Sequence, residues 1–512
     1  MVEPREVELK LICDGADLAR LRDWPRLSAS GPFSEDRLQS TYFDTAGQLL
    51  RKSGYVLRVR RTGRGYVQTV KAAGDGLIER PEWEQSVAGD EPDRSGLHAT
   101  PAAELLGKRS TLVPLFSVSV ERSTCTLRQG RSLIEVALDH GSVRRAEAVG
   151  EGDATRISEI ELELKEGSVS DLFALAREIA ERVPVRLGVE SKAERGFALV
   201  ETRPSREASK AGPVILHDEM TAAEAFRTVA HGCLRHLRMN EEILLERRDM
   251  DALHQARVAI RRLRSAMALF AHMLEDDQFE TIKTRLKALS EPLGRARNLD
   301  ILLSETLPAE RKRHPDDPQL PKLEKHLESQ RADAYAAVVL RLGSGEWRQF
   351  LLDIVAWVNA GRWLSEGDRP SRDEPASAFA SRALDKWSRR VRKRGRGLAG
   401  LSPQDRHKVR IAAKKLRYGA EFFASLYSGN KASKRCEVFL SALSDLQDHL
   451  GALNDIASGR ELLDSLTGPD ADAARLLADR VAAIATPKKT RRRLKRAKRA
   501  HERLTESKPF WR

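Results

Sequence analysis

Cysteines, long apolar runs and the common catalytic signatures are scarce or missing in this chain of 512 residues. Its four cysteines are far apart and form no CxxC pair, which argues against a cysteine-rich zinc site and suits a reducing compartment. No apolar run approaches the roughly 18 residues that a membrane helix needs. Charges also interrupt the N-terminal stretch where a signal peptide would be apolar. We therefore expect a cytoplasmic protein with no membrane partner.

Three widespread catalytic motifs are also absent, namely Walker A, HExxH and GxSxG. The GRG and GSG fragments that do occur lack the strand, loop and helix context of a phosphate-binding loop. What the chain has is charge, since 32% of its residues are charged and 41% are apolar. This composition is typical of a globular protein of two or three domains.

The net charge of +14 is unevenly divided along the chain. Residues 1–200 hold 29 Lys and Arg against 32 Asp and Glu, a balance of −3, whereas the rest holds 60 against 43, a balance of +17. This asymmetry suggests that the second part binds a polyanion. Nine of its cations lie between Lys488 and Arg499, and we expect a disordered basic arm there because like charges repel at helical spacing.

Residues 1–200 show short alternating runs separated by Gly and Pro, which predict seven or eight antiparallel strands. The runs are EVELKLI, QSTYFDT, YVLRVRR, YVQTVKA, EWEQSVA, FSVSVERSTCTLR, LIEVALDHG and ISEIELELKEG. A helix at 169–183, capped by Ser170 or Asp171, is expected to follow the last strand.

Many of these runs place their charged residues on one face and their apolar residues on the other. In EVELK, residues 6–10, Glu6, Glu8 and Lys10 share a face, and EIELE, residues 159–163, repeats the pattern. Salt bridges on a surface would explain any single strand. Across six strands, the regular alternation favours a barrel of about eight strands whose charged faces point inward. There, carboxylates could hold Mg²⁺ while cations hold phosphate oxygens.

The strand region resembles the CYTH family, also called triphosphate tunnel metalloenzymes. The resemblance rests on ExExK, TYFDT, LRVRR, TVK, RPEWE, the late EIE and SKAERG. It implies an eight-stranded antiparallel tunnel that hydrolyses a triphosphate with Mg²⁺ or Mn²⁺. The metal ligands that it implies are Glu6, Glu8, Glu159, Glu161 and Glu163. The implied catalytic residues are Glu6, Glu8, Lys10, Arg58, Arg60 and Lys71, and the implied phosphate ligands are Lys10, Arg58, Arg60, Lys71, Arg80, Arg122 and Lys192.

From about residue 215 the pattern becomes helical, and it contains a repeat. HQARVAIRRLR at 254–264 and HKVRIAAKKLR at 407–417 share the pattern H-x2-R-x3-[RK]-[RK]-x-R. LGRARNLD at 293–300 and LGALND at 450–455 follow them, each about 40 residues later. Two blocks in the same order indicate a duplicated helical unit.

On a helix, each histidine motif gathers its cations on one broad face with no compensating acid, an arrangement that favours an anion site. A solvated face is the plain alternative, and DNA is a competitor, although few aromatic or amide side chains are placed to read bases. The repeat resembles the CHAD domain, an all-helical fold of two related four-helix halves. This resemblance implies binding of inorganic polyphosphate. The expected ligands are His254, Arg257, Arg261, Arg262, Arg264, His407, Arg410, Lys414, Lys415 and Arg417.

The sequence therefore predicts an α+β protein with a tunnel domain at 1–201, a linker at 202–213 and a helical domain at 214–505, duplicated at about 214–345 and 370–505. The expected function is metal-dependent hydrolysis of inorganic triphosphate to pyrophosphate and phosphate. The attached domain is expected to bind polyphosphate and to associate the protein with polyphosphate granules.

Three alternatives stay open at this point. The tunnel could act on an organic triphosphate, such as thiamine triphosphate or a nucleotide. The whole chain could be a non-catalytic protein that targets polyphosphate, although such a binder needs cations more than carboxylates. The basic tail could bind nucleic acid, which we do not expect to be the main partner.

Overall fold

The computed structural model describes residues 5–29, 31–63, 65–72, 76–107, 110–146, 154–201, 207–365, 370–464, 479 and 487–512. The chain divides into two compact units. The first, the barrel unit, comprises Met1–Glu207 and Gly345–Ala360. The second, the helical unit, comprises Ala208–Ser344 and Gly361–Arg512.

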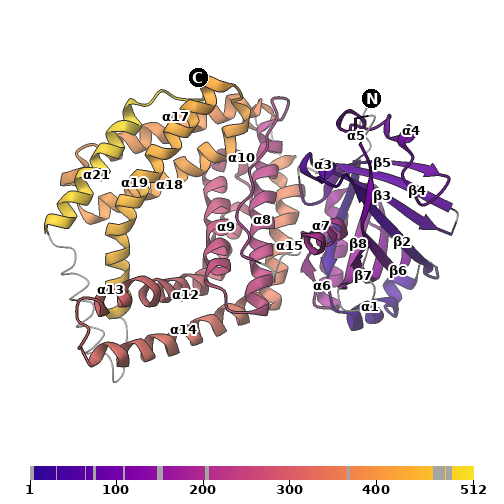
Figure 1. The fold of residues 1–512 in the computed structure, drawn as a ribbon, viewed down its shortest axis with the longest axis horizontal. Helices are drawn as coiled ribbons and strands as arrows, with labels where there is room; N and C mark the ends of the chain where they lie inside the picture. Colours follow the sequence, from indigo (N-terminus) through magenta and orange to yellow (C-terminus); the bar gives the residue numbers. More distant parts are fainter. Residues whose placement is uncertain are drawn as a thin grey trace. The chain divides into compact units, whose positions relative to one another are not determined.

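Eight antiparallel strands close into a barrel in the first unit (Figure 1), as predicted. The eight barrel strands are β1 Arg5–Ile12, β2 Ser34–Asp44, β3 Tyr55–Thr62, β4 Gly65–Ala72, β5 Glu79–Val87, β6 Val113–Gln129, β7 Ser132–Arg145 and β8 Thr155–Glu166, and a ninth, two-residue strand, β9 Arg186–Leu187, joins the same sheet. Their order is β5-β4-β3-β2-β6-β7-β8-β1-β9, and a further pairing of β1 with β5 closes the ring. The start of β1 pairs with β5, and its end pairs with the short β9. A barrel of this size has room inside for side chains or one small ligand.

The apolar faces of the strands point outward and are covered by helices. Leu9 and Leu11 of β1 are fully buried, as are Ile160 and Leu162 of β8. The helices of this unit are α1 Gly15–Arg22, α2 Pro25–Ser28, α3 Leu49–Lys52, α4 Arg94–Leu97, α5 Ala102–Leu105, α6 Val169–Arg182, α7 Lys192–Val200 and α15 Gly345–Ala360. Helix α6 packs on β6, β7 and β8. With the apolar faces outside, the charged faces line the interior.

Helix α6 was predicted at the right place, but its cap was predicted wrongly. Ser168, not Ser170 or Asp171, is the N-cap, and its hydroxyl accepts a hydrogen bond from the Ser170 N–H at 3.1 Å. The Asp171 carboxylate instead accepts a hydrogen bond from the Ser132 hydroxyl at 2.6 Å. The helix therefore begins at Val169, as predicted, and Asp171 ties it to the start of β7.

Helix α7 is held rigidly against the barrel wall. Ser191 and Glu194 form a capping box at its N-terminus. Gly196 lets the helix approach β6 closely, because a Cβ at this position would lie 2.1 Å from the Phe116 ring. That ring also stacks on Tyr42, with 4.6 Å between the centroids. The packing fixes Lys192, the first residue of the helix, at the barrel.

Helix α15 belongs to the barrel unit although its neighbours in sequence belong to the helical unit. It packs against α6 and β9. The Arg177 guanidinium of α6 contacts the Asp353 carboxylate of α15 at 3.1 Å. The predicted helical domain at 214–505 therefore contributes one helix to the barrel unit.

The second unit is entirely helical in the described residues, apart from an isolated bridge between Thr221 and Pro375. Its α-helices are α8 Ala222–Glu246, α9 Met250–Leu269, α10 Ala271–Leu274, α11 Phe279–Leu289, α12 Glu291–Ile301, α13 Leu307–Arg311, α14 Gln319–Gly343, α16 Pro370–Asp373, α17 Ala376–Arg394, α18 Pro403–Phe423, α19 Asn430–Asp464 and α21 Pro487–Glu506. A π-helical segment, Leu302–Thr306, joins α12 to α13, and short 3-10 turns lie at Arg362–Leu364, Leu398–Gly400 and Ala424–Leu426. None of the described helices combines the length and apolarity needed to cross a membrane.

The duplication seen in the sequence recurs in the helix contacts. The two histidine motifs lie on α9 and α18, which contact each other. Helix α9 contacts α8 and α12, and α18 likewise contacts α17 and α19. Helices α14 and α21 complete the two halves by packing on α12 and α19, respectively. Each half therefore places its histidine motif on a central helix.

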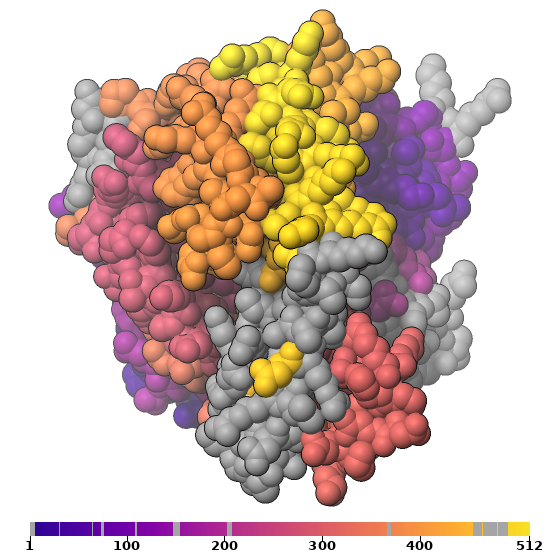
Figure 2. Space-filling model, turned by 90° about the vertical axis from the view of Figure 1, so that its left-hand side faces the viewer, coloured from indigo at the N-terminus to yellow at the C-terminus, as the bar shows by residue number. Residues whose placement is uncertain are grey.

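The prediction of a disordered basic arm was wrong, because the described part of the tail forms helix α21. Figure 2 shows this segment (yellow) lying across the orange residues of the second half. Leu494, Ala497, Ala500 and Leu504 are buried, whereas Arg492, Lys495, Arg496, Lys498 and Arg499 are exposed. The apolar residues recur at three- and four-residue spacing and pack on α19, which offsets the repulsion between the exposed cations.

Gly196→Ala should destabilise the protein by about 1–3 kcal/mol, because the new methyl group would collide with the Phe116 ring. The control is Gly232→Ala in α8, where a Cβ would meet nothing within 4 Å. Since alanine is the better helix former, this control should stabilise by about 0.5–1 kcal/mol. Urea unfolding of the full chain measures both. Equal effects of the two substitutions would contradict the close approach of α7 to β6.

Candidate functional sites

Charged side chains from several strands meet inside the barrel. The Glu6 carboxylate of β1 accepts hydrogen bonds from Lys71 of β4 and from Arg80 of β5, both at 3.0 Å. Arg80 also contacts Glu8 at 2.8 Å, and Lys10 pairs with Glu8. These contacts confirm that the charged face of EVELK points into the barrel.

Three carboxylates form a cluster on the adjoining strands β7 and β8. One oxygen each from Asp139, Glu159 and Glu161 lie within 4.8 Å of one another. The side chains of Asp139 and Glu159 are fully buried. The Arg122 guanidinium holds both oxygens of Asp139 at 2.7 and 2.6 Å and also contacts Glu161. An oxygen-only donor set of this kind fits Mg²⁺ or Mn²⁺.

Two cations of α7 reach the same cluster. The Lys192 ammonium contacts Asp139 at 2.6 Å, Glu159 at 2.5 Å and Glu161 at 2.8 Å. One turn later, Arg195 contacts Glu159 at 3.1 Å. Burial opposes charging of Lys192, but Glu159 and Glu161 raise its pKa well above the ordinary value. The lysine is therefore charged at neutral pH.

Across the barrel from this cluster, β3 and β4 carry an arc of cations, Arg58, Arg60 and Lys71, that lie close to other cations. The Arg60 Nε donates to the Ser40 hydroxyl at 3.2 Å. Burial, with the nearby charges of Arg58 and Arg122, lowers the pKa of Arg60 to about 10. Burial and the charges of Arg80 and Arg58 also lower the pKa of Lys71. A bound polyanion would relieve this repulsion, so the arc is suited to phosphate oxygens.

In the helical unit, the two histidine motifs have equivalent surroundings. A Cβ on Gly294 of α12 would lie 3.0 Å from an Nη of Arg257, and a Cβ on Gly451 of α19 would lie 3.8 Å from the Nε of Arg410. The glycine of each LG pair thus makes room for the same arginine of its motif. This correspondence gives the duplicated sequence blocks a common structural role.

The cations of each histidine motif, residues 254–264 on α9 and 407–417 on α18, form a basic stripe, and the cations of these two stripes repel their neighbours. Burial, followed by Arg297, Arg261 and Arg257, lowers the pKa of His254 to about 4. Burial and the charges of Arg261 and Arg297 lower the pKa of Arg257 to about 10. On the other stripe, the pKa of Lys415 is lowered by burial and then by Arg390 and by Arg264 of the first motif. The two stripes therefore approach each other at their C-terminal ends.

Two family models match the chain, the CYTH domain over residues 4–197 and the CHAD domain over residues 228–464. The chain consists of a CYTH domain followed by a CHAD domain. The barrel with its inward charges is the CYTH domain, and the duplicated helices form the CHAD domain.

Known relatives cover each domain separately. An inorganic triphosphatase of Haemophilus influenzae is 34% identical over 166 residues, which are 32% of this chain and 46% of that protein. The chain therefore spans about half the length of this curated relative. The solved CHAD domain of the plant Ricinus communis is 27% identical, with a TM-score of 0.50, covering 57% of this chain and 97% of that one. A Hippeastrum protein, proposed as an adenylyl cyclase and described as having a dominant triphosphatase activity, is 18% identical with a TM-score of 0.29, covering 38% and 95%.

The structure brings together most of the residues predicted for the CYTH domain but separates the metal ligands into groups. Glu159 and Glu161 lie in the three-carboxylate cluster, whereas Glu6 and Glu8 lie among Lys10, Lys71 and Arg80. Lys10 bridges the groups by contacting Glu161 at 3.1 Å. Arg58 is buried and donates to the Thr69 hydroxyl at 2.9 Å.

Glu163 and Asp139 differ most from the sequence-based expectation. Glu163 is 30% exposed, pairs with Lys165 at 2.7 Å and lies outside the three-carboxylate cluster. Asp139 lies in that cluster but was not predicted as a ligand. The available signal was in LIEVALDHG, whose acids Glu135 and Asp139 fall on one face of β7, with Asp139 opposite Glu159.

In the CHAD domain, two predicted polyphosphate ligands have an acidic partner that the sequence analysis did not anticipate. Arg262 is buried, contacts Glu421 at 2.6 Å, and lies over the rings of Tyr418 and Phe422. Arg417 contacts the same carboxylate at 3.4 Å. The expectation that these faces hold no compensating acid is therefore corrected, and Arg262 is placed where it joins α9 to α18.

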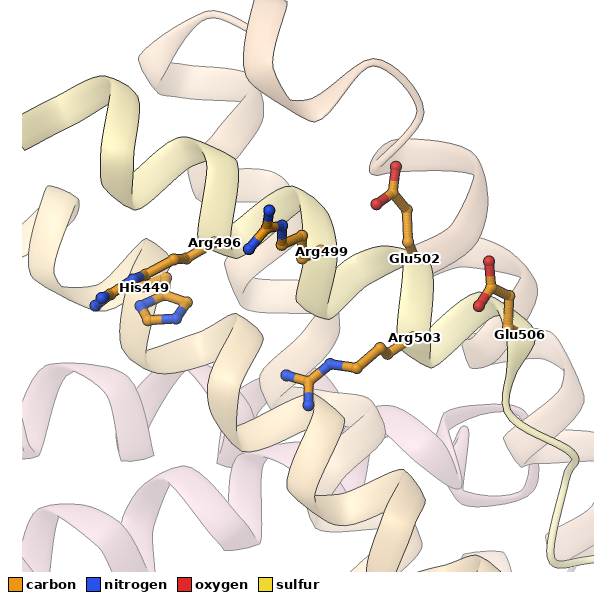
Figure 3. Close-up of a pocket in the computed structure, with 6 residues that line it drawn as sticks. All are labelled: His449, Arg496, Arg499, Glu502, Arg503 and Glu506. Carbon is orange, nitrogen blue, oxygen red and sulfur yellow. The ribbon is translucent and has the colours of Figure 1, made fainter. Parts of the chain in front are cut away.

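A shallow pocket lies along α19 and α21 in the CHAD half of the chain (Figure 3). It is lined by His449, Arg496, Arg499, Glu502, Arg503 and Glu506. Arg496, Arg499 and His449 lie near one another in this view, whereas the two glutamates point away. Arg503 is paired with Asp445 of α19. The pocket therefore includes cations of α21, a helix that lies beyond residue 464, where the CHAD match ends.

Glu161→Gln should weaken Mn²⁺ binding by at least about tenfold, a loss typical even of groups that only support metal ligands. Glu163→Gln is the matched control, two residues along the same strand and outside the cluster, and it should change the affinity less than about threefold. Calorimetric titration of the full chain with Mn²⁺ measures both. Equal losses in the two variants would show that the metal site includes the outer part of β8.

Proposed function

We propose that the CYTH domain hydrolyses inorganic triphosphate to pyrophosphate and phosphate with the help of Mg²⁺ or Mn²⁺. The observation that supports this most directly is the division of charge inside one closed barrel. Three clustered carboxylates on β7 and β8 face an arc of cations on β3 and β4, where burial and neighbouring cations lower the pKa of Arg60 and Lys71. The 34% identity to an inorganic triphosphatase supports the same reaction.

The acidic residues of the barrel would bind the metal, and its basic residues would bind the substrate. Asp139, Glu159 and Glu161 would hold the metal, which when bound supplies Lewis acidity at the phosphate and a more acidic water. Lys10, Arg58, Arg60, Lys71, Arg80 and Arg122 would bind the non-bridging oxygens and stabilise the charge that develops on the leaving group. These donors are already oriented by ion pairs and hydrogen bonds, so little reorganisation is needed on binding.

A cysteine nucleophile does not suit this barrel. Burial raises the pKa of Cys13 to about 12 and that of Cys125 to about 11, so both thiols stay protonated at neutral pH. Attack by water is therefore the simpler route. The inorganic substrate is preferred over an organic triphosphate because the attached helical domain carries stripes suited to a phosphate polymer.

Arg60→Met should lower kcat/KM for tripolyphosphate by about a hundredfold, because a buried donor to the developing charge is lost. The control is Arg61→Met, since Arg61 is the next residue on β3 and is exposed on the other face of the strand. Phosphate release by the full chain is measured with Mg²⁺ or Mn²⁺, with tripolyphosphate, thiamine triphosphate and ATP as substrates. Activity that survives EDTA would exclude the metal mechanism. A clear preference for an organic triphosphate would reassign the substrate, and no turnover of any substrate would favour a binding module.

We further propose that the CHAD domain binds inorganic polyphosphate along its two basic stripes and thereby associates the protein with polyphosphate granules. The pKa values of His254 and Arg257 are lowered first by burial and then by neighbouring arginines, and a bound polyanion would offset the repulsion among those arginines. Arg264 of the first stripe lies near enough to Lys415 of the second to lower its pKa, so one polyphosphate chain could contact both stripes. Arg262 is left out of this proposal because its guanidinium is buried against Glu421.

Reversing Arg257 and Arg261 to Glu should lower the affinity for long-chain polyphosphate by more than about tenfold and reduce the salt slope by about 2. Reversal of the exposed Lys322 and Lys325 of α14 changes the net charge equally and serves as the control. Binding is measured by fluorescence anisotropy of labelled polyphosphate across a salt series. If both double variants lose affinity alike, attraction by overall charge would replace the stripe as the explanation.

A further inference from the structure

The Lys192 ammonium lies at the three carboxylates that are best placed to hold a metal. It is within 2.8 Å of an oxygen of each of Asp139, Glu159 and Glu161. These are the residues whose oxygens cluster within 4.8 Å of one another. In the structure, a cation from the chain itself therefore neutralises the cluster.

The lysine is able to leave the cluster without unfolding its surroundings. Helix α7 is anchored by its capping box and by the contact of Gly196 with Phe116, so its backbone is fixed. The ammonium is carried on a flexible four-carbon stem, unlike the planar and more rigid guanidinium groups nearby. Arg122 contacts Asp139 and Glu161, Arg195 contacts Glu159, and both arginines would remain when Lys192 moves.

We propose that Lys192 is an internal counter-ion that occupies the carboxylate cluster until metal and triphosphate bind together. Lys192 must leave these oxygens before they can hold a divalent ion, and its displaced charge then needs an anion. A bound triphosphate supplies that anion inside the same barrel. This inference rests on the proposed function in so far as it expects a divalent ion and a triphosphate in the barrel.

The consequence is a positive coupling between the two ligands. When Lys192 leaves the cluster in the absence of triphosphate, its buried charge has no anion to pair with. This cost lowers the apparent affinity for the metal. When triphosphate is present, Lys192 exchanges the carboxylates for a phosphate oxygen, and the cost of moving its charge falls. By reciprocity, metal should tighten the binding of triphosphate by the same factor.

Lys192→Met tests the proposal, because it keeps the length of the side chain but removes the competing charge. Mn²⁺ binding to the full chain is measured by calorimetry in phosphate-free buffer. Lys192→Met should bind Mn²⁺ at least about tenfold more tightly than the natural protein. Lys71→Met removes another barrel lysine, which pairs with Glu6 and Glu82, and should change the affinity less than about threefold. Unchanged or weaker binding to Lys192→Met, or an equal gain in Lys71→Met, would overturn the proposal.

Two further measurements separate this role from a purely structural one. Lys192→Arg keeps a competing cation and should bind Mn²⁺ as weakly as the natural protein, so a gain like that of Lys192→Met would count against the proposal. Thermal unfolding should show a larger stabilisation by Mn²⁺ in Lys192→Met, where three buried carboxylates lack their lysine. If Lys192→Met folds only with Mn²⁺ present, its unfolding on addition of EDTA would likewise show that Mn²⁺ stabilises this variant. Because these assays contain no substrate, their outcome is independent of whether tripolyphosphate is hydrolysed.

Discussion

The cost of placing charge inside a closed barrel is the constraint on which this structure depends. Buried charges are tolerated only when opposite charges or bound ions compensate them. The barrel meets this condition by pairing opposite charges from different strands, as when Glu6 contacts both Lys71 and Arg80. Closure of β1 on β5 brings these residues within reach of one another. Along each strand, charged residues alternate with apolar ones, so the apolar faces point outside, where α6 and α7 pack on them.

Compensation in the barrel is uneven, and the unevenness indicates function. The clustered carboxylates of Asp139, Glu159 and Glu161 contact Arg122, Lys192 and Arg195, whereas burial and like-charged neighbours lower the pKa of Arg60 and Lys71. A site that were only structural would be expected to balance both arcs. In the helical unit, burial and neighbouring cations likewise lower the pKa values of His254, Arg257 and Lys415.

Much of the fold could be predicted because period-2 alternation and helical spacing are local signals. The inward face of EVELK and the duplicated histidine motifs follow directly from those patterns. What failed depended on partners distant in sequence. The burial of Arg262 depends on Glu421, which lies on another helix, and α21 is ordered by packing on α19. Helix α15 joins the barrel unit through Asp353, whose partner Arg177 precedes it by 176 residues. Asp139 was missed because two isolated acids in a mostly apolar run are a weak signal until β8 places Glu159 opposite Asp139.

The central claim is that the inward charges of the barrel divide into a metal-holding cluster and a phosphate-holding arc. The most direct test is the position of Mn²⁺ in crystals grown with a non-hydrolysable tripolyphosphate analogue, located by anomalous scattering. The account predicts a peak among Asp139, Glu159 and Glu161, with the analogue against Arg58, Arg60 and Lys71 and with Lys192 moved onto a phosphate oxygen. A peak outside these carboxylates, or an analogue bound outside the barrel, would contradict it.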